Sequence, residues 1–463
     1  MLSFFRVIVI LFRVVVALTI AVLAGAIPVL GAAPPILVIR DGALFDSISG
    51  TMQPGRTVVI EGPTIKAVGT PEKPVAVPAG ARVIDARGKF VVPGLIDAHV
   101  HLVHRLNFAH VTGDEVLPLF LANGITAVRD TGDEIVAQTA VAHFARAQPD
   151  RCPRVFTASY LIDGDPPIHR DAGLPVTDPA KVPAVVEDMA AWGVTTLKIY
   201  GKTARPVGRR LIEEGHRRGL TVTGHLINYP ARQAVEDGID CLEHITTVFD
   251  FAIPPEAAGK PGHRAAVDLG NPQAKALVAA LVARKVMVAP TLTVFRNMLL
   301  LSDLEEIHNH PDNAAVPERL RVSWDQYRQT QGFTPDTRQR RRGEFRKYQE
   351  LTGILWRAGV PLLAGTDAPE PYCPPGLALH QELELLVASG LTPAAALQAA
   401  TIAPARALKQ AQNLGSIEAG KLADLLILTS DPTADVRNTR KIELIVRGGQ
   451  VCHPKGPHRP LSR

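Results

Sequence analysis

Residues 91–102 read VVPGLIDAHVHL, and this stretch decides how the rest of the chain is interpreted. The apolar run turns at Pro93-Gly94 and then carries His99 and His101. Because side chains alternate between the two faces of a strand, two histidines separated by one residue point the same way. Two neutral imidazoles directed into one cavity are a natural beginning of a zinc site. The alternative is a pair of histidines on an exposed strand face, and the remaining sequence has to distinguish the two.

The composition of the 463-residue chain is that of an ordinary globular protein, with 46% hydrophobic and 21% charged residues. Its length suits one large domain with an accessory domain, or two to three medium ones. A net charge of +5 and an aromatic content of 5% argue against a nucleic-acid partner. The cysteines are far apart and form no CxxC pair, which argues against a thiolate zinc site or a disulfide framework. They are Cys152, Cys241, Cys373 and Cys452.

The N-terminus has the pattern of a secretory signal. Arg6 and Arg13 precede an apolar run, VVVALTIAVLAGAIPVLGAA, at residues 14–33. A charged start, an apolar middle and small residues at the end are typical of a signal peptide, and Pro28 favours cleavage. The run is nearly long enough to span a bilayer, so an uncleaved membrane anchor is the alternative. The sequence therefore predicts an exported protein, periplasmic or secreted, that meets a membrane only through residues 1–33.

Short β-type runs occur at both ends of the chain. They are ILVIRDGALFD (36–46), TVVIEGPTIKAVG (57–69), ARVIDARG (81–88), KLADLLIL (421–428) and KIELIVRGGQV (441–451). Asp-Gly, Gly-Pro and Asp-Pro pairs lie within or between these runs, as is typical of turns between strands. We therefore expect a small β-sandwich domain assembled from both termini, residues 34–92 and 413–463, beside a central unit at residues 93–412.

In the central unit, further β-type runs alternate with helical patterns. They are GITAVR (124–129), RVFTA (154–158), VTTLKIY (194–200), LTVTGH (220–225), CLEHI (241–245), VMVAPTL (286–292) and VPLLAGTD (360–367). With the opening stretch they predict an α/β fold, a (β/α)8 TIM barrel, whose chemistry lies at the C-terminal strand ends. The long helical insertion at residues 295–353 is either a lid over the mouth or an enlarged outer helix.

Six polar residues fall at or near the C-terminal ends of these predicted strands. They are His99, His101, Lys198, His225, His244 and Asp367. Each one alone is explained by a hydrogen-bonded core residue or a carboxylate that caps the following helix. Together they form the donor set that a dinuclear metal site needs, which favours the metal interpretation of the opening histidines.

The order of the motifs resembles that of the metal-dependent amidohydrolase superfamily. The motifs are PGLIDAHVHL (93–102), GITAVRDTG (124–132), LKIY (197–200), TGHL (223–226), EHI (243–245), GTDA (365–368), LHQELELLVASGLTPAAALQAATIAPARAL (379–408) and GSIEAGKLADLLIL (415–428). Within it, the chain is most similar to the branch of imidazolonepropionase-like proteins and of dipeptidases that cleave Xaa-Pro or Xaa-Arg and Xaa-Lys bonds. The resemblance implies a barrel that holds two zinc ions and a flanking β-sandwich built from both termini.

The resemblance also implies a role for each candidate ligand. His99, His101 and Asp367 would hold the more buried zinc ion, and His225 and His244 the more exposed one. Each of these donors matches a position in the family's motifs.

Lys198 matches the bridging lysine of the family, whose amine carbon dioxide converts to a carbamate. A carbamate offers two oxygens and a negative charge, whereas an ammonium would repel the cations. A salt-bridged lysine in a single-metal member is the alternative. In the implied mechanism the metals lower the pKa of water toward ~7, and Asp367 receives the proton and passes it to the leaving amine.

Two residues near the barrel mouth are candidates for contact with substrate. Strand alternation places Tyr200 on the same side as Lys198, although aromatic packing at the barrel top is an alternative. His169 follows the third strand, where related enzymes often carry a polar residue that faces the substrate; a surface loop position is the alternative. His104 either supports the site or lies at the surface.

Two further substrate candidates are Tyr229 and Arg129. Related dipeptidases commonly carry a tyrosine two residues after the histidine that corresponds to His225, but Ile227 occupies that position here. Tyr229 is the nearest tyrosine. Arg129 ends the second strand and could anchor a substrate carboxylate, whereas an internal ion pair is the more common role of such a residue.

The sequence therefore predicts an exported, zinc-dependent hydrolase that cleaves a C–N bond of a small-molecule substrate, either a dipeptide or an N-acyl amino acid. A cyclic-amide hydrolase or lactonase with the same metals is the first alternative. A non-catalytic binding protein that retains the barrel is a more distant one. Assembly into a homo-oligomer stays open.

Overall fold

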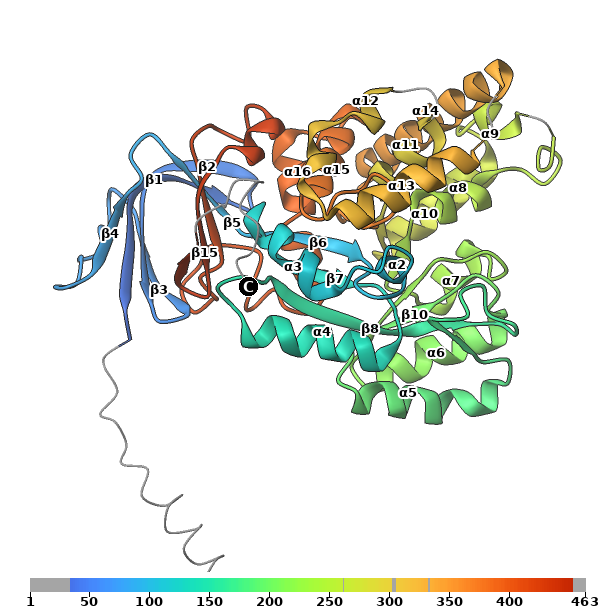
Figure 1. Cartoon of the computed structure of the whole chain (residues 1–463), viewed down its shortest axis with the longest axis horizontal. Helices are drawn as coiled ribbons and strands as arrows, with labels where there is room; N and C mark the ends of the chain where they lie inside the picture. The colour runs from blue at the N-terminus through green and yellow to red at the C-terminus, as the bar shows by residue number, and fades with distance from the viewer. Residues whose placement is uncertain (1–33, 261, 302–304, 332–333, 453–463) are drawn as a thin grey trace, which may run out of the picture.

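The computed structural model describes residues 34–260, 262–301, 305–331 and 334–452. The predicted signal or anchor at residues 1–33 lies outside these ranges, as does the C-terminal part of the expected terminal domain, residues 453–463. Within the described ranges, no helix combines the length and the apolar character needed to cross a bilayer. Figure 1 shows a β-domain made from both ends of the chain beside a larger α/β unit.

The larger unit is built around a parallel sheet. Its strands, in spatial order, are β6 (Leu95–Val100), β7 (Ile125–Asp130), β8 (Arg154–Asp163), β10 (Thr196–Ile199), β11 (Thr221–Gly224), β12 (Cys241–Glu243) and β13 (Met287–Ala289), with β9 (Gly173–Pro175) paired to β8. The eighth predicted strand is an extended segment that makes single parallel bridges from Leu362 to Val288 and from Ala368 to Val100. These bridges join the last segment to both edges of the sheet, so the TIM barrel prediction is confirmed.

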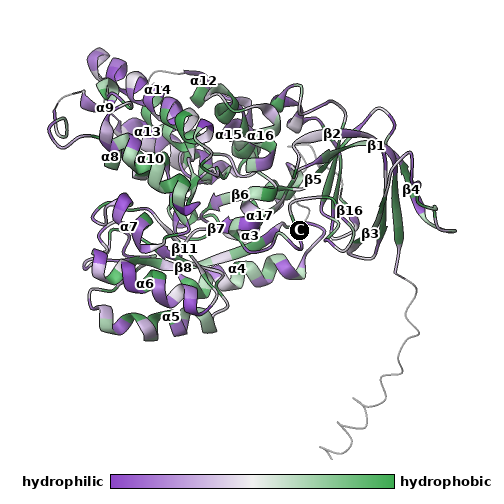
Figure 2. Cartoon of the chain, turned by 180° about the vertical axis from the view of Figure 1, so that it is seen from behind, coloured by the Kyte–Doolittle hydropathy of each residue, from purple (hydrophilic) through white to green (hydrophobic). Residues whose placement is uncertain are grey.

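Helices surround this sheet. Those before the long insertion are α2 (His104–Asn107), α3 (Gly113–Ala122), α4 (Ile135–Ala147), α5 (Val182–Ala191), α6 (Arg205–Arg217), α7 (Ala231–Asp237), α8 (Ile245–Ala252), α9 (His263–Ala266) and α10 (Pro272–Arg284). Those after it are α15 (Leu377–Ala388), α16 (Pro393–Ala399) and α17 (Ile402–Ala407). Helix α6 shows why they pack here, since Val207, Leu211 and Ile212 are buried on one face while Arg209 is exposed. Figure 2 shows the same mixture of hydrophilic and hydrophobic residues along α5 and α6.

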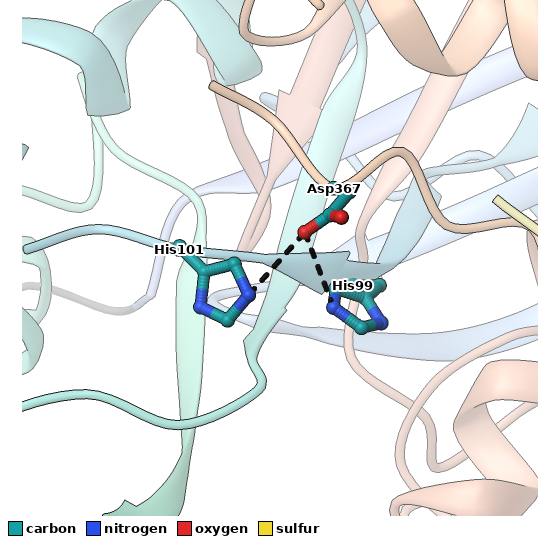
Figure 3. A group of neighbouring side chains, drawn as sticks. All are labelled: His99, His101 and Asp367. Carbon is teal, nitrogen blue, oxygen red and sulfur yellow. Dashed lines mark ion pairs between the residues drawn. The ribbon is translucent and has the colours of Figure 1, made fainter. Parts of the chain in front are cut away.

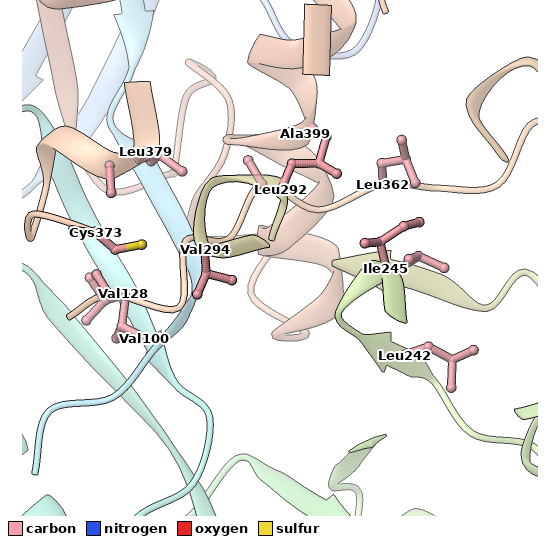
Figure 4. Packing of buried hydrophobic residues seen from close by; sticks show 14 of the residues in the cluster. Val100, Val128, Leu242, Ile245, Leu292, Val294, Leu362, Cys373, Leu379 and Ala399 are labelled. Atoms are coloured by element: carbon pink, nitrogen blue, oxygen red, sulfur yellow. The ribbon is translucent and has the colours of Figure 1, made fainter. Parts of the chain in front are cut away.

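The insertion forms α11 (Leu292–Leu300), α12 (Glu305–His308), α13 (Glu318–Thr330) and the long α14 (Pro335–Arg357). Buried residues of α11, such as Val294, join side chains from the strands and from α15 in one apolar core (Figure 4). The Trp324 indole of α13 donates a hydrogen bond to the Pro369 carbonyl, 3.1 Å away, in the loop after the eighth strand. The insertion therefore contributes both to the outer helical layer and to the wall of the barrel mouth.

Hydrogen bonds join the strands of the terminal β-domain in one sheet. The order is β16 (Gln450–Cys452), β15 (Ile442–Arg447), β14 (Leu425–Leu428), β5 (Phe90–Pro93), β1 (Ile36–Asp46), β2 (Thr51–Glu61) and β3 (Thr64–Gly69), with β4 (Arg82–Asp85) paired to β1. Register shifts on both sides of Gly42 interrupt β1, which pairs with β4 before this point and with β5 after it. Such irregularities bend a strand, so one sheet folds over a core that includes Ile39, Val58 and Leu425.

The Pro93-Gly94 turn passes the chain from this sheet into the barrel. Pro93 ends β5, and the Gly94 amide donates to the Asp424 carbonyl of the C-terminal segment at 2.8 Å. A Cβ atom at position 94 would lie only 2.2 Å from Thr126 Oγ1 of β7. Glycine is therefore required at position 94, because the turn between β5 and β6 approaches β7 closely.

Candidate active site

His99, His101 and Asp367 meet at the C-terminal end of the barrel (Figure 3). His99 Nε2 and His101 Nε2 each lie 3.3 Å from Asp367 Oδ1. The three side chains are buried, and their facing donor atoms all lie within 4.8 Å of one another. Asp367 has a φ of 61°, a strained value for a residue with a side chain, of the kind that concentrates at functional sites.

The other three predicted ligands adjoin this group. The His244 ring centroid lies 4.5 Å from those of both His99 and His225, and His244 Nδ1 lies 3.8 Å from Asp367 Oδ2. With His101, the side chains of Lys198, His225, His244 and Asp367 line a cavity of about 160 Å³, while His99 is fully buried. The structure thus brings all six predicted metal ligands together.

Hydrogen bonds determine which ring nitrogens of the first two histidines face the site. His99 Nδ1 donates to Glu243 Oε2 at 2.7 Å, and His101 Nδ1 donates to the Gly132 carbonyl at 3.1 Å. A carboxylate and a carbonyl can only accept, so each Nδ1 carries the hydrogen and each neutral ring presents its Nε2 lone pair to Asp367. Two lone pairs and a carboxylate oxygen then face one another, an arrangement that a cation between them would stabilise.

The pKa values of three histidines bear on this arrangement. Burial lowers the pKa of His101 and of His225 to about 3, which keeps both rings neutral. Burial and Lys198 act to lower the pKa of His99, but Asp367 and Glu243 outweigh them and raise it. A proton between His99 and Asp367 would therefore also be stabilised, yet neither His99 Nε2 nor Asp367 Oδ1 has a hydrogen-bond partner among the described residues.

Three buried polar atoms at this site have no hydrogen-bond partner among the described residues: His99 Nε2, Asp367 Oδ1 and Lys198 Nζ. Leaving such atoms unsatisfied is costly, and ligand or metal sites are a common reason for it. Burial also lowers the pKa of Lys198 to about 8, so part of the amine is neutral near neutral pH. The donor set therefore fits divalent cations, and the lysine fits a bridging carbamate.

Arg129 does not reach this cavity, which corrects its assignment as a substrate contact. Its side chain is 2% exposed; Nη2 lies 2.5 Å from Glu243 Oε1, and Nε donates to the Ala98 carbonyl at 2.6 Å. Thr223 also donates to Glu243. Arg129 therefore holds the carboxylate that orients His99, which is the internal ion pair named as its alternative.

Tyr229 also lies outside the cavity. Its ring packs over Gly208, where a Cβ atom would come within 2.4 Å of the ring, and its hydroxyl donates to Asp237 at 2.6 Å. The aromatic ring fills the space that the glycine leaves between α6 and the segment before α7. This packing role replaces the expected contact with substrate.

Tyr200 and His169 do line the cavity, as expected for residues that contact substrate. His169 Nε2 and the Tyr200 hydroxyl are 3.0 Å apart. His104 adjoins them and is buried, with Nδ1 2.7 Å from Asp133 Oδ1, so it is not a surface residue. These side chains form the polar wall of the cavity.

The sequence interpretation missed the opposite wall and several supporting carboxylates. Val294, Phe295 and Met298 of α11 make one side apolar, and Arg105 and Glu370 form an ion pair at the same cavity. Glu243 could have been noticed as a charge inside the apolar run CLEHI. Arg105 and Glu370 follow no periodic pattern, so no comparable signal marks them.

One missed carboxylate holds α11 in place. Glu382 of α15 accepts hydrogen bonds from the backbone amides of Leu292 and Thr293, at 2.9 and 2.7 Å. It thereby caps the N-terminus of α11. The preceding residue, Thr291, contacts His244 Nδ1 through its hydroxyl at 2.8 Å. Glu382 therefore positions both the apolar wall and a predicted metal ligand.

Comparison with known proteins identifies the family. The sequence pattern of the Amidohydrolase family matches residues 90–452, well over half of the chain. The chain belongs to the amidohydrolase family. One relative is the adenine deaminase of Rubrobacter xylanophilus, 39% identical over 88 residues, which are 19% of this chain. The match spans only 14% of that deaminase.

Solved structures resemble this amidohydrolase over much more of its length. An Xaa-Pro dipeptidase with methionine in its active site has a TM-score of 0.67 and 20% identity, covering 90% of this chain and 100% of the other. A putative prolidase from Bifidobacterium longum has a TM-score of 0.68 and 24% identity, covering 92% and 97%. At these identities the likeness shows a common fold.

Proposed function

We propose that this amidohydrolase is a metal-dependent hydrolase that cleaves a C–N bond of a small substrate, a dipeptide or an N-acyl amino acid. The observation that carries the proposal is the meeting of His99 Nε2, His101 Nε2 and Asp367 Oδ1 around one point, without a hydrogen bond between them. Neutral imidazoles and a carboxylate are the donors that metal ions bind in proteins, so this arrangement supports a metal site over a network of hydrogen bonds.

The residues of the chain divide between two divalent cations, which we propose to be zinc. His99, His101 and Asp367 would hold one, and His225 and His244 the other. Such cations supply Lewis acidity and, at neutral pH, a nucleophile derived from water.

Lys198 would bridge the pair after carboxylation. The neutral Nζ forms a bond to the carbon of carbon dioxide and releases one proton, which leaves a carbamate with a single negative charge. The depressed pKa of the buried amine supports this step, because only the neutral form has a lone pair.

Asp367 would move the proton. Its three histidine neighbours hold the pKa of the carboxylate well below its usual range, although burial acts to raise it. The side chain therefore stays ionised at neutral pH and can accept a proton within the cavity. It would then give the proton to the leaving amine.

The test is a substrate panel on the purified full-length protein. Dipeptides and N-acyl amino acids should be hydrolysed with release of the free amine, and a chelator should abolish turnover until zinc is restored. Hydrolysis restricted to cyclic amides or lactones would favour the first alternative. A metal-loaded protein that turns over none of these compounds would favour the non-catalytic one.

We also propose that the protein is exported, on the pattern of residues 1–33 alone. Fractionation of the native host should find the protein in the periplasm or outside the cell. A full-length chain confined to the cytoplasm would contradict the proposal.

A further inference from the structure

We propose that Arg105 and Glu370 form a carboxylate-binding subsite at the mouth of the cavity, in which the Arg105 guanidinium holds a carboxylate of the substrate. The inference rests on the proposed hydrolase function and names the residue that would recognise the carboxylate shared by dipeptides and N-acyl amino acids. The sequence suggested Arg129 as the residue that anchors a substrate carboxylate, but Arg129 forms an ion pair with Glu243. Arg105 takes that role instead.

Both residues lie close in sequence to proposed reacting groups. Arg105 belongs to α2, which begins three residues after His101, and Glu370 follows Asp367 in one turn, with its amide donating to the Asp367 carbonyl at 3.0 Å. Both side chains line the same cavity as Lys198. A carboxylate held by Arg105 would therefore lie in one cavity with the groups proposed to cleave the amide.

The Arg105 guanidinium has more N–H donors than its ion pair with Glu370 uses. Arginine carries five N–H groups in a planar fork that matches a carboxylate with two parallel hydrogen bonds. Within the described part of the chain, Arg105 makes a single ion pair, from Nη2 to Glu370 Oε1. Its remaining N–H groups can therefore bind a second carboxylate without breaking this pair.

The exposure of the two side chains favours arginine as the group that contacts substrate. The Arg105 side chain is 28% exposed, whereas that of Glu370 is 10% exposed. The loop that carries Glu370 is held by a hydrogen bond that the Trp324 indole donates to the Pro369 carbonyl. Glu370 is thus a positioning residue that holds Arg105 toward the cavity.

The wall beside this subsite indicates the rest of the ligand. Val294, Phe295 and Met298 from α11, together with Leu161, make it apolar. An acid with an apolar side chain would bury that side chain here while its carboxylate meets Arg105. The expected amine product is therefore an apolar amino acid.

The experiment measures binding rather than turnover. The probe is the ketone analogue of N-acetyl-leucine, in which a methylene replaces the amide nitrogen so that the molecule cannot be hydrolysed. Its neutral counterpart carries a primary alcohol in place of the carboxylate. Calorimetric titration of the full-length, metal-loaded protein should show that the acid binds on the order of tenfold or more tightly than the alcohol.

Variants identify the residue responsible for this preference. Arg105→Met should abolish it, Arg105→Lys should retain part of it, and Glu370→Gln should leave the acid preferred. Arg319→Met is the matched control, because Arg319 forms a comparable ion pair with Glu115, at 2.7 Å, away from the cavity. Thermal unfolding of each variant separates loss of the fold from loss of the subsite.

The outcomes also separate this inference from the proposed function. Equal affinity for acid and alcohol in the wild type, or a preference that survives Arg105→Met, overturns the subsite even if the protein hydrolyses amides. Loss of the preference only in Glu370→Gln likewise overturns it. A preference that depends on Arg105 supports the subsite even in a protein without amidohydrolase turnover.

Discussion

The deep end of the cavity and its mouth are built from different parts of the barrel. The deep end takes its side chains from strand ends, including His99 on β6, Lys198 on β10 and His225 just after β11. The mouth takes Arg105 from a short helix, Glu370 from a loop and its apolar wall from the insertion helix α11. The proposed chemistry therefore depends on positions that the barrel itself fixes, whereas selectivity depends on segments that the barrel leaves free to vary.

The largest effect should come from the deep end. Asp367→Asn removes the carboxylate that is proposed to carry the proton, so kcat should fall by about 10²- to 10⁴-fold. Asp336→Asn is the control, because Asp336 lies on the exposed surface of α14. Steady-state rates with a substrate from the panel provide the measurement. Near-normal turnover in Asp367→Asn would remove this residue as the proton carrier.

A second change tests the support behind the deep end. Glu243→Gln leaves the buried Arg129 guanidinium without its charged partner, so the free energy of unfolding should fall by about 3–5 kcal/mol. Urea denaturation measures this loss. Glu213→Gln, which breaks an exposed pair with Arg209, should cost no more than about 1 kcal/mol. Equal losses in the two variants would mean that the buried network does not stabilise the site.

A change in the mouth should be smaller and should alter selectivity. Met298→Ala removes part of the apolar wall, so kcat/KM for leucine-containing substrates should fall by roughly tenfold relative to alanine-containing ones. Metal content should stay unchanged, because Met298 is not among the proposed metal ligands. A uniform loss across substrates, or a loss of metal, would contradict the separation between mouth and deep end.

The smallest expected effect is on the pH dependence of stability and concerns Glu382, which contacts the helix that forms the apolar wall of the mouth. Burial raises the pKa of this carboxyl from 4.5 to about 7, so the folded protein retains a proton that the unfolded chain has lost. Its contribution to stability is therefore present below about pH 4.5 and declines as the pH rises through about 7. Denaturation curves between these values should show Glu382→Gln gaining stability relative to the wild type as the pH rises. A stability difference between Glu382→Gln and the wild type that does not change with pH would contradict the raised pKa of Glu382.

The same comparison explains what the sequence could predict. The alternation of strands and helices predicted the barrel, and strand ends in a barrel converge, so the sequence alone could place His99, Lys198 and Asp367 together. Arg129 was correctly placed at a strand end, but whether its side chain points to substrate or to Glu243 depends on packing inside the barrel. The sequence does not contain that information in a local pattern.

The mouth was harder to predict because its residues come from segments without periodic constraint. Arg105 and Glu370 are 265 positions apart, and only the closure of the barrel brings them into contact. Tyr229 was misplaced for a related reason, since its position depends on the glycine at 208 in α6.

The single folded sheet of the β-domain likewise depends on the irregularity at Gly42, which the strand patterns did not reveal.

Metal analysis of the purified full-length protein tests the central claim most directly. The account predicts about two metal ions per chain, a reduced content in Lys198→Ala, and partial rescue of the activity of that variant by short carboxylic acids. An unchanged metal content in Lys198→Ala would show that the lysine bridge does not exist. A wild-type protein that binds no metal when zinc is supplied would contradict the account as a whole.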